Sequence, residues 1–238
     1  MRKTGTIYGI NGPVIYLKGN TGFRMSEMVH VGKEHLVGEV IGLDKRQTTI
    51  QVFEETTGLK PGETVEATGD AISVTLGPGI LHNIFDGIQR PLSEIAAQSG
   101  SFISRGVSVD SLDTEKKWKV HITVSEGEQV SGGTVIAETQ ETTSILHRSM
   151  VPPNLSGRVT KVVEDGEYTI KDTLMVLELD DGTTQELTLC QKWPIRIARP
   201  VLERYPASKP LITGQRILDT MFPIAKGGTA AVPGGFGT

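Results

Sequence analysis

Short segments of alternating apolar and polar residues, separated by turn signals, constrain the fold of this chain more than any other feature. They include GTIYGINGPVIYL, LVGEVIGL, TTIQVFEET and TVEATG, all within the first 75 residues. Pairs such as Pro61-Gly62 and Gly69-Asp70 mark the turns. Alternation with a period of two is typical of strands that bury one face. The pattern predicts a mainly β protein that begins with a small closed β-barrel over residues 1–75.

The pattern changes over residues 76–109, where we expect a connector with one short helix. Pro91 suits the first turn of a helix, because its missing N–H has no helical partner there. Gly100 can end the helix in a left-handed conformation, so a helix from Pro91 to Ser99 is predicted. We expect Asp86 and Arg90 to fix the turn and the helix entrance rather than to act as an acid–base pair.

A second β region, residues 110–192, contains an internal repeat. VSEGEQVSGGTVIAE and VEDGEYTIKDTLMVLE align on Gly127 and Gly166, at an offset of 39 residues. Such a repeat resembles the barrel-sandwich fold of biotinyl and lipoyl carrier domains. Those carriers attach their cofactor to a lysine in the hairpin that joins the halves, and residues 139–150 contain no lysine. The fold is therefore predicted without the carrier function, with a further tight hairpin at Asp181-Gly182.

The next stretch, residues 193–210, contains prolines at positions 194, 200, 206 and 210, and we predict it to be a linker. Each proline removes a backbone donor and favours an extended predecessor. In the last segment, 211–238, Thr213 is the expected N-cap of a short helix from Gln215 to Phe222, with a proline following as a stop. The sequence GGTAAVPGGFGT then predicts a short buried strand that runs into a glycine-rich loop.

Composition disfavours several classes of function. The chain has 24 Lys and Arg residues against 28 Asp and Glu residues, with no long run of either sign, so no nucleic-acid partner is expected. No apolar run approaches the ~20 residues of a membrane-spanning helix. The single cysteine, Cys190, is expected in a half-buried strand position and suits a reducing compartment. The histidines show no ligand spacing, so no metal site is predicted; they are His30, His35, His82, His121 and His147.

The chain ends on GGFGT, which matches the first five positions of the phosphate-binding pattern GxxxxGK[ST]. In such a loop, backbone N–H groups surround the phosphates at the N-terminus of a helix. The lysine and hydroxyl residue that complete the pattern are absent from the sequence. Phe236 is expected to be a packing residue and Thr238 a backbone amide contact. The predicted nucleotide-binding residues are Gly234, Gly235, Phe236, Gly237 and Thr238.

Two longer stretches carry a resemblance to a known family. Residues 213–238, TGQRILDTMFPIAKGGTAAVPGGFGT, resemble the entry to the nucleotide-binding domain of rotary ATPase catalytic subunits, and FDGIQRPL resembles the segment that closes their N-terminal barrel. The second β region, residues 110–192, lies between these two stretches as an insertion. With this insertion, the whole chain resembles the catalytic A (alpha) subunit of V-type and archaeal-type (V/A) ATPases. One departure is Gly235, where many members have proline, and glycine suits the loop geometry equally well.

The resemblance implies that residues 211–238 begin a P-loop α/β nucleotide-binding domain that is cut within the loop. The full-length subunit would bind ATP or ADP with Mg²⁺, and its complex would couple ATP hydrolysis or synthesis to proton or sodium transport. The family's P-loop lysine and threonine and its catalytic carboxylates are expected beyond Thr238, so no catalytic residue is predicted within the chain. The implied location is peripheral, on the cytoplasmic face of a membrane. The implied partners are a B subunit that alternates with it in an A3B3 head, a central rotor stalk, peripheral stator stalks and a membrane ion-translocating sector.

The 238-residue chain alone is expected to be inactive and to bind ATP negligibly, because half of a loop without its helix cannot hold its amides in place. Residues 1 to about 190 are expected to fold and residues 201–238 to be mobile, since segments below ~40 residues seldom fold unaided. An alternative function is a non-catalytic assembly or stator-binding module made of the β domains. A β-rich carrier or structural protein unrelated to ATP is disfavoured by the missing hairpin lysine and by the final segment.

Overall fold

The computed structural model describes residues 3–19, 21–81, 83–100, 102–201 and 203–235. The chain divides into two compact units, Met1–Ala198 and Arg199–Thr238. The boundary between the units falls inside the proline-rich stretch predicted to be a linker. The finer division of the chain into five parts remains a prediction.

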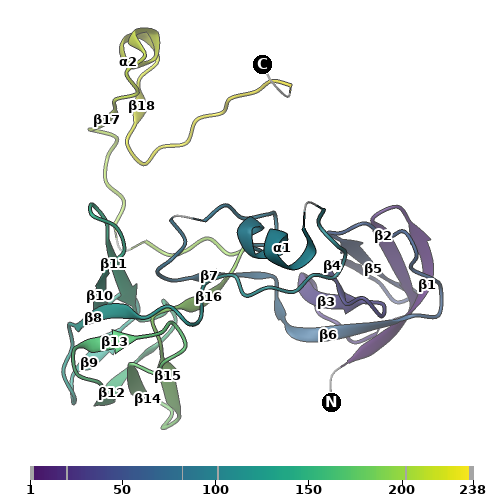
Figure 1. Ribbon diagram of the computed structural model, residues 1–238, viewed down its shortest axis with the longest axis horizontal. Helices are drawn as coiled ribbons and strands as arrows, with labels where there is room; N and C mark the ends of the chain where they lie inside the picture. The colour runs from purple at the N-terminus through teal and green to yellow at the C-terminus, as the bar shows by residue number, and fades with distance from the viewer. Residues whose placement is uncertain (1–2, 20, 82, 101, 202, 236–238) are drawn as a thin grey trace. The chain divides into compact units, whose positions relative to one another are not determined.

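Six antiparallel strands of the first unit form a closed barrel in the order β1-β2-β5-β4-β3-β6 (Figure 1). This confirms the barrel predicted from the alternating segments. Because every strand is paired on both sides, the barrel has no open edge. The strands are β1 (Thr4–Asn11), β2 (Val14–Lys18), β3 (Glu27–Val31), β4 (Leu36–Leu43), β5 (Gln47–Val52) and β6 (Thr64–Ala71).

The barrel core follows the period of two in the sequence. On β2, Ile15 and Leu17 are fully buried, and on β3 Val29 and Val31 are fully buried, while their neighbours along each strand are more exposed. The pairing register shifts between Val40 and Gly42 on β4, as it also does on β1. Such bulges bend a strand and increase its twist, which helps a short sheet to close on itself.

A two-stranded ribbon follows the barrel. In it β7 (Ser73–Leu76) pairs with β16 (Gln191–Pro194), a strand from more than a hundred residues further along the chain. Two residues of the predicted linker, Trp193 and Pro194, therefore lie in a strand. Proline is tolerated there because it is the last residue of a strand that has a partner on one side.

Among the described residues of the first unit there is one helix, α1 (Leu92–Ser99), which begins one residue later than predicted. Pro91 is its N-cap residue and has an extended backbone, with ψ of 126°, instead of lying in the first turn. Gly100 follows the helix with φ of 72° and donates its N–H to the Ala96 carbonyl, so the glycine end of the helix is confirmed. The helix buries Ile95.

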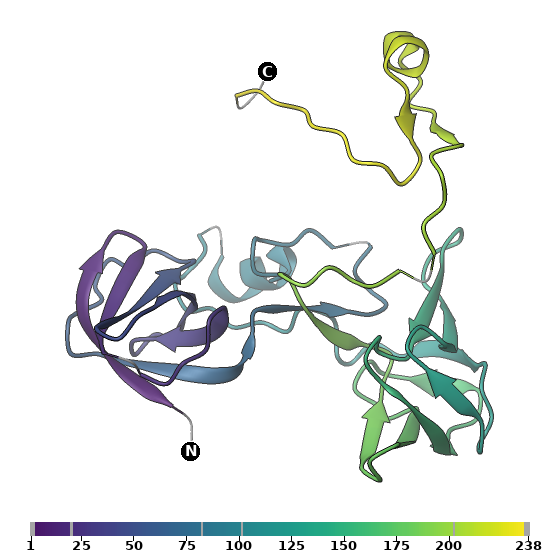
Figure 2. The ribbon, with the colours of Figure 1, turned by 180° about the vertical axis from the view of Figure 1, so that it is seen from behind.

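The second β region forms two four-stranded antiparallel sheets, in the orders β11-β10-β8-β13 and β15-β14-β12-β9 (Figure 2). Buried residues of both sheets form one hydrophobic cluster, including Val120, Ile136, Val159 and Leu177. The strands are β8 (Trp118–Ile122), β9 (Gln129–Ser131), β10 (Val135–Gln140), β11 (Leu146–Met150), β12 (Ser156–Val162), β13 (Gly166–Tyr168), β14 (Met175–Leu179) and β15 (Thr184–Leu187).

The internal repeat of the sequence is visible in this pairing. Strands β8, β10 and β11 of one sheet correspond to β12, β14 and β15 of the other, and Ala137↔Ile122 and Val176↔Lys161 are equivalent pairs. The remaining strand of each half crosses to the other sheet, because β9 pairs with β12 and β13 pairs with β8. The two halves are interlocked, which confirms the predicted barrel-sandwich fold. The predicted turn at Asp181-Gly182 joins β14 to β15 and is also confirmed.

The second unit contains little regular structure. Its elements are β17 (Pro210–Leu211), α2 (Arg216–Met221) and β18 (Ile224–Ala225), and β17 pairs with β18. The helix is one residue shorter at each end than predicted, and Gln215 rather than Thr213 is its N-cap residue. The predicted buried strand after it is wrong for residues 227–235. They carry no strand, and Val232 is 95% exposed.

Candidate functional site

The predicted nucleotide-binding residues lie at the end of the second unit. Gly234 and Gly235 are exposed and belong to no helix or strand, and Phe236, Gly237 and Thr238 lie outside the described residues. A Cβ atom built on Gly235 would meet nothing within 4 Å. The described part of this loop therefore shows no cradle of converging amides, and the phosphate-binding loop remains a prediction.

Asp219 on α2 organises the start of the segment that carries these glycines. Its Oδ1 accepts hydrogen bonds from the Thr213 N–H at 3.0 Å and the Thr213 hydroxyl at 2.8 Å, and its Oδ2 accepts the Gly214 N–H at 3.0 Å. The bonds from Thr213, more than that from Gly214, lower the pKa of the Asp219 carboxyl group, although partial desolvation opposes them. Thr213 therefore donates hydrogen bonds to Asp219 on α2 and is not the N-cap residue of that helix.

A charged cluster lies where the connector meets the barrel. Asp86 accepts the backbone N–H groups of Ile88 and Arg90, and Arg90 Nε donates to Asp86 Oδ2 at 2.7 Å. Burial raises the pKa of the Asp86 carboxyl group, but the hydrogen bonds from Arg90 and Ile88 outweigh it and lower the pKa overall. Asp86 and Arg90 fix the turn before α1, as predicted. Arg90 Nη1 also lies 3.4 Å from Glu54 Oε2 of the barrel, a contact that the sequence did not indicate.

A second ion pair joins distant parts of the first unit. Arg196, which follows β16, donates to both carboxylate oxygens of Glu39 on β4, at 2.6 and 2.5 Å. The Glu39 side chain is 1% exposed. A signal for Glu39 was present in the sequence, because a single acidic residue interrupts the apolar segment LVGEVIGL, but nothing in the sequence identified its partner.

The hairpin between β10 and β11, within the stretch where the sequence lacks a carrier lysine, holds a glutamate. Glu141 Oε1 accepts the backbone N–H groups of Gly79 at 2.7 Å and Leu81 at 3.3 Å, and its Oε2 lies 3.6 Å from His147 Nδ1. Burial lowers the pKa of His147, although the nearby Glu141 carboxylate acts in the opposite direction. This glutamate is used to attach the hairpin to the connector.

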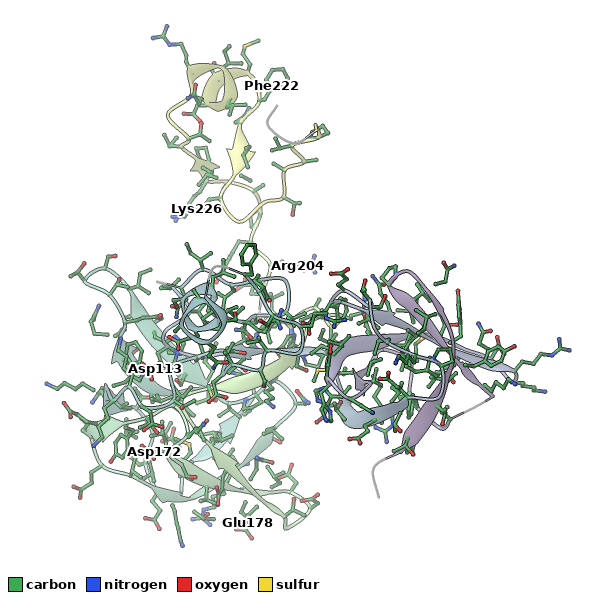
Figure 3. The ribbon with its side chains drawn as sticks, turned by 45° about the vertical axis from the view of Figure 1, so that its right-hand side comes forward. Asp113, Asp172, Glu178, Arg204, Phe222 and Lys226 are labelled. Atoms are coloured by element: carbon green, nitrogen blue, oxygen red, sulfur yellow. The ribbon has the colours of Figure 1, made fainter. Side chains whose placement is uncertain are left out.

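A cavity of about 740 Å³ lies beside this hairpin, lined in part by Glu94, Asp113, Trp118 and Glu141. Asp113, labelled in Figure 3, accepts two backbone N–H groups of its own loop at 2.9 and 3.0 Å. Lys116 Nζ lies 3.9 Å from the centre of the Trp118 ring. Asp113, Lys116 and Glu141 contact neighbouring groups of the chain, and none of these contacts places a nucleophile beside a base.

The histidines are dispersed over the first unit. His121 Nδ1 lies 2.7 Å from Asp165 Oδ2 on the surface, and this hydrogen bond raises the pKa of His121. His30 and His35 meet edge to face at the barrel, and His82 lies outside the described residues. Over residues 3–19, 21–81, 83–100, 102–201 and 203–235, no group of three or more His, Cys, Asp or Glu side chains could hold a metal ion. None of the helices in these ranges has the length and apolar character that a membrane-spanning helix requires.

Comparison with known proteins gives matches over both β regions. The family described as "ATP synthase alpha/beta family, beta-barrel domain" matches residues 7–69, and that described as "ATPsynthase alpha/beta subunit barrel-sandwich domain" matches residues 109–196. Both matches agree with the barrel and the interlocked sheets seen in the structure.

Three curated relatives match almost the whole chain. The V-type ATP synthase alpha chain of Halothermothrix orenii is 52% identical over 237 residues, covering 100% of this chain and 40% of the relative. The V-type ATP synthase alpha chain 2 of Clostridium tetani is 54% identical, and the A subunit of the A-type ATP synthase of Methanopyrus kandleri is 51% identical, each over 98% of this chain. The chain spans 39% and 40% of the lengths of these two relatives.

Proposed function

The chain belongs to the ATP synthase alpha/beta family, beside the alpha chains and A subunits of V-type and A-type ATP synthases, and from this membership we propose that it is part of the catalytic subunit of an ion-transporting rotary ATPase. One observation carries the proposal. Identity of about half the residues extends over the entire chain, through the barrel, the inserted sheets and the segment that ends in Gly234 and Gly235.

In the proposed catalytic subunit, the glycines at 234, 235 and 237 supply backbone N–H groups to the phosphates of ATP or ADP, and Thr238 adds a further amide. Mg²⁺, when bound with the nucleotide, neutralises phosphate charge. The described residues do not fit this ion, because none of them forms a cluster of carboxylates, and the 238 residues contain no Gly-Lys-Thr or Gly-Lys-Ser. The residues that would catalyse hydrolysis are therefore not assigned to this chain.

The proposed partners follow from the family. A non-catalytic B subunit would alternate with this one in a hexameric head, with a central rotor stalk, peripheral stator stalks and a membrane sector that moves protons or sodium ions. The protein would lie on the cytoplasmic face of the membrane as a peripheral component. The relatives named as ATP synthase subunits support a place in a complex of several different polypeptides.

The first test uses an antibody against residues 110–192 to isolate the native assembly under mild conditions. We expect the antigen to be a polypeptide well above 25.7 kDa, the mass of the 238 residues, in an assembly that hydrolyses ATP and contains a second, related subunit. A species at 25.7 kDa in an assembly without ATPase activity would contradict the proposal and favour a non-catalytic assembly or stator-binding module.

The second test concerns the 238-residue chain alone. We expect calorimetry with Mg-ATP to show no saturable binding up to millimolar nucleotide, because two exposed glycines in an irregular segment do not hold converging amides. Saturable binding that disappears in a variant shortened to residues 1–198 would contradict this expectation and would place a working nucleotide site within the second unit.

A further inference from the structure

Three glutamates of the barrel region meet arginines that lie outside the barrel. Glu34 pairs with Arg105 at 3.1 Å, and the other two pairs are Glu54 with Arg90 and Glu39 with Arg196. Two of the arginines belong to the segment between the barrel and the inserted sheets, and Arg196 belongs to the segment that follows the inserted sheets and β16. The chain is therefore held against the barrel both before it enters the inserted sheets and after it leaves them.

The outgoing segment is held through its backbone as well as its side chains. The Gly106 N–H donates to Glu54 Oε2 at 2.9 Å, and Arg90 Nη1 donates to the Val107 carbonyl at 3.0 Å. A Cβ atom on Gly106 would lie 2.2 Å from the Glu34 carbonyl oxygen, and Gly106 has φ of 68°. A glycine is needed here both for its conformation and for the close approach of two backbones.

The returning segment is held by the pair between Glu39 and Arg196. Its two parallel N–H···O bonds fix the orientation of the guanidinium group as well as its position. The preceding residue is also held, since the Ile195 N–H donates to the Ile72 carbonyl at 3.1 Å. Releasing Arg196 would leave the Glu39 carboxylate buried without a counter-charge, which strongly disfavours opening.

We propose that these contacts form a clamp, made of Glu54 with Gly106 and of Glu39 with Arg196, that makes the barrel and the inserted sheets move as one rigid body. Inserted sheets that are anchored on one side only can swing about that segment, but anchors on the segments before and after them remove that hinge. A load applied to the inserted sheets would then reach the barrel directly. The clamp concerns mechanics and does not require that the chain bind nucleotide.

A different ion pair provides a matched control. Arg148 on β11 donates to Glu138 on β10 at 3.1 Å, so it links two neighbouring strands of one sheet. Removing this pair changes the same residue types and the same net charge as removing Arg196. It does not touch either connection between the barrel and the inserted sheets.

The test measures the distance between spin labels on the two β regions of the 238-residue chain. Labels are placed by Lys45→Cys in the β4–β5 turn and Gln185→Cys on β15, both exposed, in a Cys190→Ser background. We expect a single narrow distance distribution. The clamp variants Arg196→Gln and Gly106→Ala should give distributions roughly twofold broader, while Arg148→Gln should stay narrow. A broad distribution in the parent protein, or narrow distributions in both clamp variants, would overturn the proposal.

A second variant keeps the test decisive if Arg196→Gln unfolds the barrel. The double variant Glu39→Gln, Arg196→Gln removes the buried charge together with its partner, so the barrel should remain folded. We expect the Ile195 amide, measured by hydrogen exchange, to exchange roughly tenfold faster in it than in the parent. Unchanged Ile195 exchange together with a narrow label distance in a folded double variant would show that the pair is not a clamp.

Discussion

The barrel and the segment from Arg199 onward contain the same apolar residue types, but the barrel buries them and the segment leaves them exposed. Ile50 on β5 is fully buried, whereas Ile217 on α2 is 68% exposed. In the barrel each strand has a neighbour on both sides, so every inward side chain meets others across the core. In the second unit, α2 and two strands of two residues each provide no such surroundings. An apolar residue indicates burial only where the fold supplies neighbours.

The energetic difference between the regions follows directly. Burying a side chain such as Ile, Leu or Val contributes roughly 1.5–3 kcal/mol relative to leaving it exposed. Fixing the backbone of one residue costs about 1–2 kcal/mol. The barrel offsets that cost with a continuous core, and the second unit has no buried residue on its helix to do so.

The largest effect is expected from a matched pair of truncations that tests this contrast. Ile50→Ala should destabilise the barrel by about 3 kcal/mol, because it leaves a cavity in a packed core. Ile217→Ala should change stability by less than about 0.5 kcal/mol. Hydrogen exchange of peptides from the barrel and from the second unit, measured through a urea titration, reports the two changes separately. A comparable loss in the two variants would mean that α2 packs in solution against a surface that its exposed residues do not reveal.

A smaller effect is expected from adding one methyl group to a glycine of each unit. A Cβ atom at Gly157 on β12 would lie 2.3 Å from the Glu178 carbonyl oxygen, so Gly157→Ala should destabilise the inserted sheets by about 1–3 kcal/mol. Gly235→Ala, with open space around it, should have no measurable effect on thermal unfolding. If Gly235→Ala proved as costly as Gly157→Ala, the final loop would have to be packed, and the contrast between the units would fail.

The smallest effect is local and depends on pH. Because the folded-state pKa of Asp219 is lowered, its bonds to Thr213 and Gly214 stabilise the fold above the unfolded pKa of about 3.9 and are lost as pH falls through the folded value. We expect the amide NMR signals of Thr213 and Gly214 to move to random-coil positions as pH falls through this lowered folded-state pKa, while the barrel signals remain dispersed.

Asp219→Asn provides the control for this titration, since it retains one acceptor oxygen but has no proton to gain in this range. Its Thr213 and Gly214 signals should stay constant over the acidic range in which those of the parent change. A titration that persists in Asp219→Asn would assign the change to another carboxyl group.

The two β regions could be predicted because their signals are local. Alternation along β2 and β3, turn pairs such as Asp181-Gly182 and the repeat around Gly127 and Gly166 each depend on residues close together in the sequence. The helix limits were less accurate. Pro91 was predicted in the first turn of a helix and is the N-cap residue, and Thr213 was predicted as an N-cap residue but Gln215 has that position. The capping residue depends on backbone geometry that several nearby residues can adopt.

Local patterns in the amino-acid sequence were enough to identify a barrel, a repeated β region and an ending similar to a phosphate-binding loop. Which distant residues meet became visible only in the folded chain. Glu39 and Arg196 are 157 positions apart, and β9 and β13 exchange between sheets, yet no local pattern marks either event. The physical reason is that periodicity reports which face of an element is apolar, whereas an ion pair or a strand exchange depends on where whole elements pack.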